Sequence, residues 1–148
     1  MNSLQSAELR RYQTVGTESL LAAARPAQVI QLMLDGAVSR LAVTRGCIER
    51  GDTAGGGRAL GQTVSLIGGL RDSLDHASGG ELAARLDALY DYMIRTLLRA
   101  HLERDLVEMD DVARLLDDVR SGWLAVVESD VDGGERTRAM GDVGGALR

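Results

Sequence analysis

The chain is poor in aromatic residues, cysteine and proline, and it contains no lysine. It has no Phe, one Trp and three Tyr in 148 residues, so four positions supply every large aromatic side chain. The single cysteine, Cys47, excludes an intramolecular disulfide and agrees with a reducing cytoplasm. The net charge of -5 at pH 7 argues against nucleic acid as a partner, because phosphate backbones require basic surfaces.

Long apolar runs are absent as well. No stretch approaches the roughly 18 consecutive apolar residues of a membrane-spanning helix. The start of the chain, MNSLQSAELRR, lacks the apolar segment of a signal peptide. We therefore expect a cytoplasmic protein that does not insert directly into membranes. Hydrophobic residues make up 45% of the chain and charged residues 26%, which is typical of one globular domain with its own core.

The residue patterns of common catalytic and metal sites are missing. Di-metal bundles use Glu-x-x-His pairs, but neither His76 nor His101 has Glu three residues before it. One cysteine cannot form a cysteine-based metal site, and Cys47 lies on an apolar helical pattern where a core role fits better. The glycines of AGGGRALG follow no strand and lack the Lys-Ser/Thr ending of a phosphate loop. We expect no catalytic residues, no metal and no cofactor, and thus no enzyme.

Apolar residues recur at three- and four-residue spacing in four segments, which indicates four amphipathic helices. The first begins at Pro26, whose missing N–H is tolerated in a first helical turn. The glycine-rich stretch 50–58 predicts a break before the second, and Gly79 or Gly80 is expected to cap that helix at its C-terminal end.

The third and fourth helices are separated near Asp105. Asp105 and Glu108 have the spacing of a capping box at the start of the fourth helix. No strand-like alternation occurs, so the fold class expected is all-α, an antiparallel four-helix bundle over residues 26–128. Residues 1–25 are expected to form an N-terminal arm or short helix lying over the bundle. The glycine-rich residues 129–148 are expected to be a disordered C-terminal tail.

Two of the three tyrosines lie two positions apart in LYDYM, residues 89–93. A step of two residues rotates a helix by about 200°, so Tyr90 and Tyr92 must point to nearly opposite sides. The apolar residues of the first helix also cover an unusually wide arc of its surface, because those from Val29 to Leu34 spread over about 200°. Either the bundle is tightly packed beneath a covering arm, or a groove accepts an apolar helix from another protein. Both interpretations can hold together.

The sequence resembles the FliS family of flagellar export chaperones. The stretch YQTVGTESLLAAARPAQVIQLMLDGAV (12–38) is similar to the opening of that family. GGELAARLDALYDYMIRTLLRAHLERD (79–105) resembles its most recognisable segment, and VARLLDDVRSGW (112–123) resembles its last helix. The family usually has Tyr or Phe where this chain has Leu34, and Asn where it has His101.

The resemblance implies a helical bundle that captures the C-terminal helical segment of newly made flagellin. Such a chaperone prevents premature polymerisation and assists delivery to the gate of the flagellar type III export apparatus. One alternative stays open, a histidine phosphotransfer protein, because those domains are also four-helix bundles. His101 lies near a helix end and His76 in a predicted loop, and a structural role is favoured for both.

A set of nine residues is predicted to form the flagellin-binding surface. Three lie in the arm and are expected to cover the groove until the client binds. Of the tyrosine pair, Tyr90 is expected to be the more buried, because it adjoins the stripe of Leu89 and Met93. The predicted surface consists of Leu9, Tyr12, Val15, Ile30, Met33, Leu34, Tyr90, Tyr92 and Leu97.

Overall fold

The described part of the chain is a bundle of four helices. The computed structural model describes the backbone of residues 26–146 and the side chains of residues 27–128. Within that range no strand occurs, which confirms the predicted all-α bundle. The predicted arm, with Leu9, Tyr12 and Val15, lies outside the described residues. The helices are α2 (Pro26–Glu49), α3 (Thr53–Asp72), α4 (His76–Glu103) and α5 (Leu106–Ala146).

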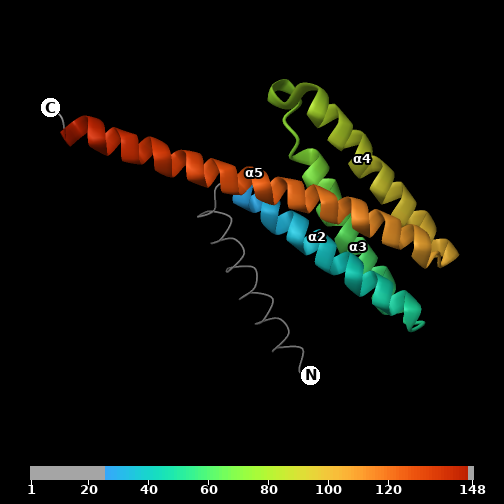
Figure 1. Ribbon diagram of the computed structural model, residues 1–148. Helices are drawn as coiled ribbons and strands as arrows, with labels where there is room; N and C mark the ends of the chain where they lie inside the picture. Colours follow the sequence, from blue (N-terminus) through green and yellow to red (C-terminus); the bar gives the residue numbers. More distant parts are fainter. Residues whose placement is uncertain (1–25, 147–148) are drawn as a thin grey trace, which may run out of the picture.

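The helices run alternately in opposite directions (Figure 1). Each helix packs against the next along the chain, and α5 returns to pack against α2. In Figure 1, α4 approaches α5 near the turn that joins them, whereas the start of α4 stands away from α5. The bundle is therefore closed at one end and splayed at the other.

The core is a single cluster to which every helix contributes. Two threonines, Thr44 and Thr63, are also fully buried. Each hydroxyl donates a hydrogen bond of 2.8 Å to the backbone carbonyl four residues earlier, that of Arg40 and that of Ala59, so neither is left unpaired. The largest fully buried apolar side chains are Leu34 and Leu41 of α2, Ile67 and Leu70 of α3, Met93 and Leu97 of α4, and Met109, Val112 and Leu116 of α5.

The glycine-rich stretch 50–58 is not a break throughout, as the sequence had suggested. α3 already begins at Thr53, with Asp52 as its N-cap accepting a hydrogen bond from the Gly55 N–H at 2.9 Å. This cap outweighs the low helix propensity of three successive glycines. Gly56 is buried, and an added Cβ would lie 3.5 Å from Cys47 and 3.6 Å from His101, which is ordinary van der Waals contact, so this position has room for a small side chain.

The predicted glycine cap of α3 is also wrong. α3 ends at Asp72, and the Ser73 N–H bonds back to the carbonyls of its last turn. The glycines instead lie at the start of α4, where Gly80 has φ 51° and ψ -123° and kinks the helix. Only glycine tolerates such an angle without strain, so Gly80 redirects the chain there.

The start of α5 confirms the predicted cap. Oδ1 of Asp105 accepts a hydrogen bond from the Glu108 N–H at 3.0 Å. α5 then continues as helix past residue 128 to Ala146. Side chains beyond 128 lie outside the described residues, and the disordered tail stays a prediction.

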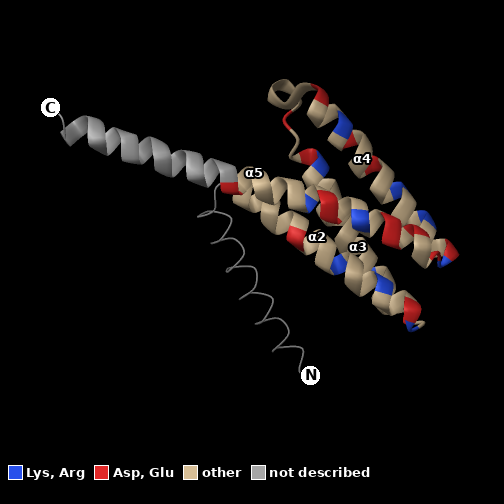
Figure 2. Cartoon of the chain, viewed as in Figure 1, with Lys and Arg blue, Asp and Glu red and all other residues tan. Residues whose placement is uncertain are grey.

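Ion pairs lie along three of the helix interfaces, α3–α4, α2–α5 and α4–α5, among charged residues of both signs spread over the bundle (Figure 2). Arg71 of α3 pairs with Asp87 of α4 at 2.7 Å and with Asp91 at 3.1 Å. Arg45 of α2 pairs with Asp110 of α5 at 2.6 Å. These hydrogen bonds lower the pKa values of Asp87 and Asp110 below the usual range. Because all the partners are partly exposed, these pairs are expected to add little to stability.

Two leucine-to-alanine substitutions test this account of the core. Leu116 is fully buried, so Leu116→Ala is expected to lower the free energy of unfolding by about 2–5 kcal/mol through lost burial and a cavity. Leu102 is 83% exposed, so Leu102→Ala is expected to change it by less than about 0.5 kcal/mol. Denaturant unfolding followed by circular dichroism measures both, and equal effects would contradict the assigned core.

Candidate functional site

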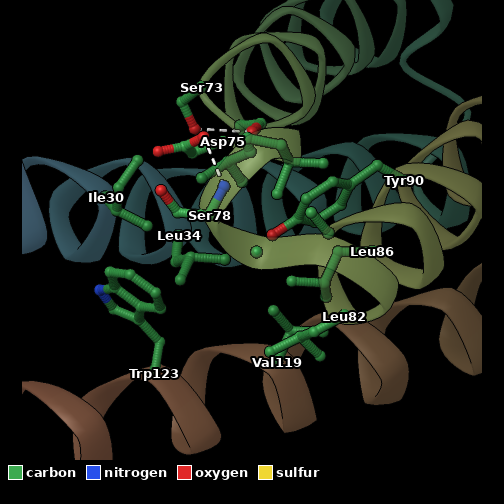
Figure 3. A pocket seen from close by; sticks show the side chains of 14 residues that line it. Ile30, Leu34, Ser73, Asp75, Ser78, Leu82, Leu86, Tyr90, Val119 and Trp123 are labelled. Atoms are coloured by element: carbon green, nitrogen blue, oxygen red, sulfur yellow. Dashed lines mark hydrogen bonds between the residues drawn. The ribbon is translucent and has the colours of Figure 1, made fainter.

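An apolar pocket of about 360 Å³ opens at the splayed end of the bundle (Figure 3). All four helices contribute to it, together with the turn between α3 and α4. Most of the lining is aliphatic or aromatic, and the polar side chains are those of Ser73 and Asp75 in that turn, Ser78 in the first turn of α4, and the Tyr90 hydroxyl. The lining residues are Ile30, Leu34, Leu70, Ser73, Leu74, Asp75, Ser78, Gly79, Leu82, Ala83, Leu86, Tyr90, Val119 and Trp123.

The start of α4 shapes one wall of the pocket. Asp75 caps α4 by accepting a hydrogen bond from the Ser78 N–H at 3.0 Å, and the kink at Gly80 follows. Leu82 and Leu86 come next, and they face Val119 of α5 across the pocket in Figure 3. Leu82 remains 65% exposed because no described element covers it. An apolar side chain of this size at a pocket mouth favours contact with another protein.

Trp123 holds the opposite wall in place. Its indole N–H donates a hydrogen bond of 2.9 Å to the carbonyl of Ala27, which joins α5 to the first turn of α2. The ring lines the pocket beside Ile30 and Leu34 (Figure 3). The indole nitrogen therefore has a hydrogen-bond partner, while the apolar face of the ring is presented to the pocket.

Tyr90 forms part of the pocket floor. It is 3% exposed, and this burial raises the pKa of its hydroxyl above the ordinary value. In Figure 3 the hydroxyl points toward the middle of the pocket. The neutral hydroxyl therefore offers one hydrogen-bonding group to an otherwise apolar cavity.

The charge at the pocket rim is negative. Hydrogen bonds from Ser78 lower the pKa of Asp75 below the usual range of a carboxyl, so it is ionised at neutral pH. Ser73 also lines this edge and donates its hydroxyl to the Leu70 carbonyl at 2.7 Å. The polar turn and the apolar walls together fit an amphipathic segment.

The residues predicted from sequence to bind a client fall in different places. Ile30, Leu34 and Tyr90 line the pocket, and the expectation that Tyr90 is the more buried tyrosine is confirmed, since Tyr92 is 45% exposed. Leu97 is fully buried in the core. Met33 packs over Gly69 of α3, where an added Cβ would lie 2.7 Å from its Cε. The structure therefore brings three of the six described residues together, and their contact with a client stays a prediction.

Sequence reasoning missed several pocket residues. Leu82 and Leu86 follow the helical apolar spacing of α4, and Trp123 continues that of α5, so spacing alone indicates core positions for them. Their position in the sequence was the one indication that they line a pocket. Large apolar residues that follow a glycine-rich turn, or that lie near the end of a helical pattern, can be exposed at the end of a bundle. Their convergence depends on how far α4 splays from α5, and local periodicity does not report that.

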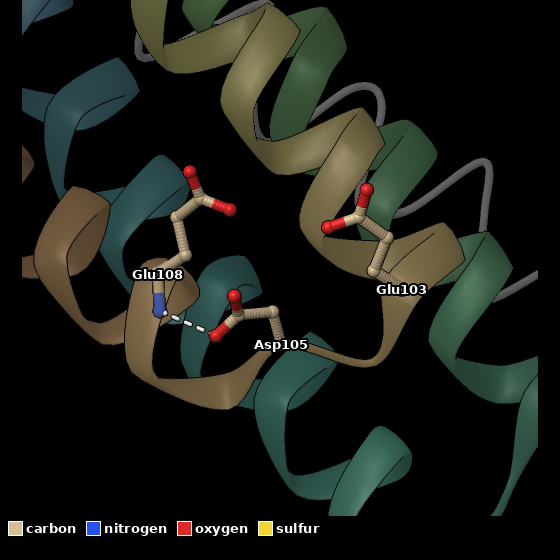
Figure 4. Close-up of side chains that lie close together, drawn as sticks. All are labelled: Glu103, Asp105 and Glu108. Carbon is tan, nitrogen blue, oxygen red and sulfur yellow. Dashed lines mark hydrogen bonds between the residues drawn. The ribbon is translucent and has the colours of Figure 1, made fainter.

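Three carboxylates meet at the closed end of the bundle, where α4 turns into α5 (Figure 4). Asp105 is occupied as the cap of α5, and Glu108 pairs with Arg99 of α4. The third, Glu103, is exposed. Helix capping and charge pairing account for two of the three carboxylates and solvent exposure for the third, so the cluster supplies no argument for a metal ion.

The histidines lie at opposite ends of α4. His76 is its first residue and is exposed, not in a loop as the sequence suggested. His101 lies in the last turn, and its Nδ1 is buried without a hydrogen-bond partner among the described residues. No described helix is both long enough and apolar enough to cross a membrane.

Comparison with known proteins gives consistent matches. The family model described as flagellar protein FliS matches residues 8–130. The flagellar secretion chaperone FliSB of Pseudomonas aeruginosa is 43% identical over 115 residues, which cover 78% of this chain and 91% of the relative. The flagellar secretion chaperone FliS of Salmonella typhimurium is 40% identical over 116 residues, with 78% and 86% covered. The protein of that name from Bacillus subtilis is 25% identical over 107 residues, with 72% and 79% covered.

The rim carboxyl gives a prediction about pH. The pKa of Asp75 is lowered in the folded protein, so its stabilising effect is present above the unfolded value of about 3.9 and is lost as pH falls through the folded value. A carboxyl-carbon NMR titration, with the signal assigned by Asp75→Asn, is expected to give a pKa below about 3.9. Asparagine still caps a helix, so that variant should fold. A titration at or above the ordinary value would refute the assigned cap.

Proposed function

The chain belongs to the FliS family, and on that premise we propose that it is a flagellar export chaperone whose client is flagellin. The family is one of chaperones and not of enzymes. In this proposal the protein binds the C-terminal helical segment of flagellin in the cytoplasm. Binding prevents premature polymerisation and assists delivery to the gate of the flagellar export apparatus.

The observation that supports this proposal best is the open apolar pocket at the splayed end of the bundle. Its mouth carries the exposed Leu82, and its floor is formed by buried core residues such as Leu34. A helix with apolar side chains at three- and four-residue spacing can insert them there while its polar face stays in solvent. Each Å² of apolar area buried is worth roughly 25 cal/mol before the cost of ordering the client. A client that folds on binding offsets part of that gain, so moderate affinity is expected.

The histidine phosphotransfer alternative receives no specific support. His101 lies in the last turn of α4 with Nδ1 buried, and His76 lies at the first position of the same helix. Neither position gives a specific reason to expect phosphotransfer. Acid-labile phosphate on His101 in purified protein would revive that alternative.

A pair of matched substitutions tests the pocket. Leu82→Glu places a charge at the apolar mouth, where an occupant would desolvate it, so affinity for a flagellin C-terminal peptide is expected to fall at least about tenfold. Leu102→Glu makes the same change at a more exposed leucine at the other end of α4 and is expected to leave affinity within about twofold. Isothermal titration calorimetry measures both. Equal affinities for the two variants would exclude the pocket as the binding site, and no binding by the wild type would exclude the proposed function.

The arm supplies a second test. Leu9, Tyr12 and Val15 precede α2, which enters the bundle beside the pocket, and we propose that they shield apolar surface until the client binds. Deletion of residues 1–15 is then expected to raise fluorescence of an apolar dye or to promote oligomers, because uncovered apolar patches self-associate. Dye titration and analytical ultracentrifugation measure these effects. Replacing Leu9, Tyr12 and Val15 by Ser in the full chain is the control for length, and if neither variant differs from wild type, the arm is not a cover.

A further inference from the structure

The arginines of the described chain divide into two groups. Seven of the eleven form ion pairs with an Asp or Glu, and these are Arg45, Arg71, Arg85, Arg95, Arg99, Arg114 and Arg120. The four without an acidic partner in the described part of the chain are Arg40, Arg50, Arg58 and Arg104. In a chain with 22 acidic residues and a net charge of -5, these arginines leave local positive charge on the surface.

Two of these four arginines face the same groove. Arg40 of α2 and Arg58 of α3 line a shallow, open groove of about 600 Å³ together with Gly61, Gln62, Ser65 and Leu66. A Cβ added at Gly61 would meet nothing within 4 Å, so the lining at this residue is open to an approaching chain. No residue of this groove also lines the apolar pocket.

The surroundings of both arginines lack negative charge. Three and four residues from Arg40 along α2 the chain has Gly, Ala, Val and Thr, and the same positions around Arg58 in α3 hold Ala, Gly, Gly and Gln. The lining of the groove includes no Asp or Glu. Within the described lining, the groove therefore carries two positive charges and no negative charge.

We propose that this α2–α3 groove is a second docking surface, and that it binds an acidic segment of a partner protein. An Asp or Glu carboxylate of that segment lies between the guanidinium groups of Arg40 and Arg58. A guanidinium group can bind a carboxylate through two parallel hydrogen bonds, whereas the ammonium group of lysine acts as a hydrated point charge. Gln62 and Ser65 supply hydrogen-bonding groups for the backbone of the segment. Because the two sites share no residue, this partner can bind while the apolar pocket is occupied.

The charge of the whole chain favours an acidic protein segment over nucleic acid. A polynucleotide carries a charge at every phosphate and needs a row of cations, whereas the groove offers two. The net charge of -5 also repels a long polyanion at distances beyond the groove. A short acidic segment needs only local complementarity.

The test uses the full-length protein and a fluorescein-labelled peptide of alternating Glu and Ala, with a Gln and Ala peptide as the neutral probe. Fluorescence anisotropy is expected to show saturable binding of the acidic peptide only, weakened by added salt. The double variant Arg40→Gln with Arg58→Gln is expected to lose about tenfold in affinity, because it removes both charge-assisted contacts. On binding of the acidic peptide, the NMR signal of the Gly61 amide is expected to shift.

The matched control is the double variant Arg85→Gln with Arg95→Gln, which makes the same change in charge at two exposed arginines of α4. It is expected to bind the acidic peptide within about twofold of wild type, because both side chains lie outside the groove. Equal loss in both double variants would overturn the assigned site, as would failure of the wild type to bind. An oligothymidylate that bound with the same dependence on Arg40 and Arg58 would replace the acidic protein segment with nucleic acid.

Discussion

Burial of one apolar stripe from each of the four helices is the constraint on which the structure depends. Leu34, Ile67, Met93 and Leu116 come from four different helices, and all are fully buried. Hydrophobic burial has no preferred direction, so it brings the helices together without fixing their angles. The polar contacts at the flanks supply direction, since they pair α3 with α4 and α2 with α5.

The ends of the bundle differ because these contacts are unevenly distributed. At the closed end, Arg99 and Glu108 join α4 to α5 beside a capped turn. At the open end, α4 begins with a cap and a glycine kink that belong to its own turn, and no described ion pair joins that part of α4 to α5. The apolar residues there consequently line a pocket instead of completing the core. A site of this kind arises from the fold itself and uses no catalytic group.

The sequence predicted the helices well and the site less well, for different physical reasons. Helical periodicity is local, so the bundle and the cap at Asp105 could be predicted from spacing alone. The glycines at 55–57 misled the prediction because the Asp52 cap starts the helix despite their low helix propensity. A wide apolar arc indicates that other elements pack against a helix, but it does not show which part of the arc is left uncovered in the bundle. Leu97 proved to be core and Leu82 the pocket mouth for that reason.

The position of the one tryptophan has an optical consequence. Trp123 lies in the pocket wall, and the chain contains no other indole to obscure its emission. Indole emission shifts to shorter wavelength when water leaves the surroundings of the ring, and its hydrogen bond to Ala27 holds that ring in one orientation. The unlabelled protein thus carries a spectroscopic reporter at its own pocket, and any occupant free of tryptophan can be followed without a dye.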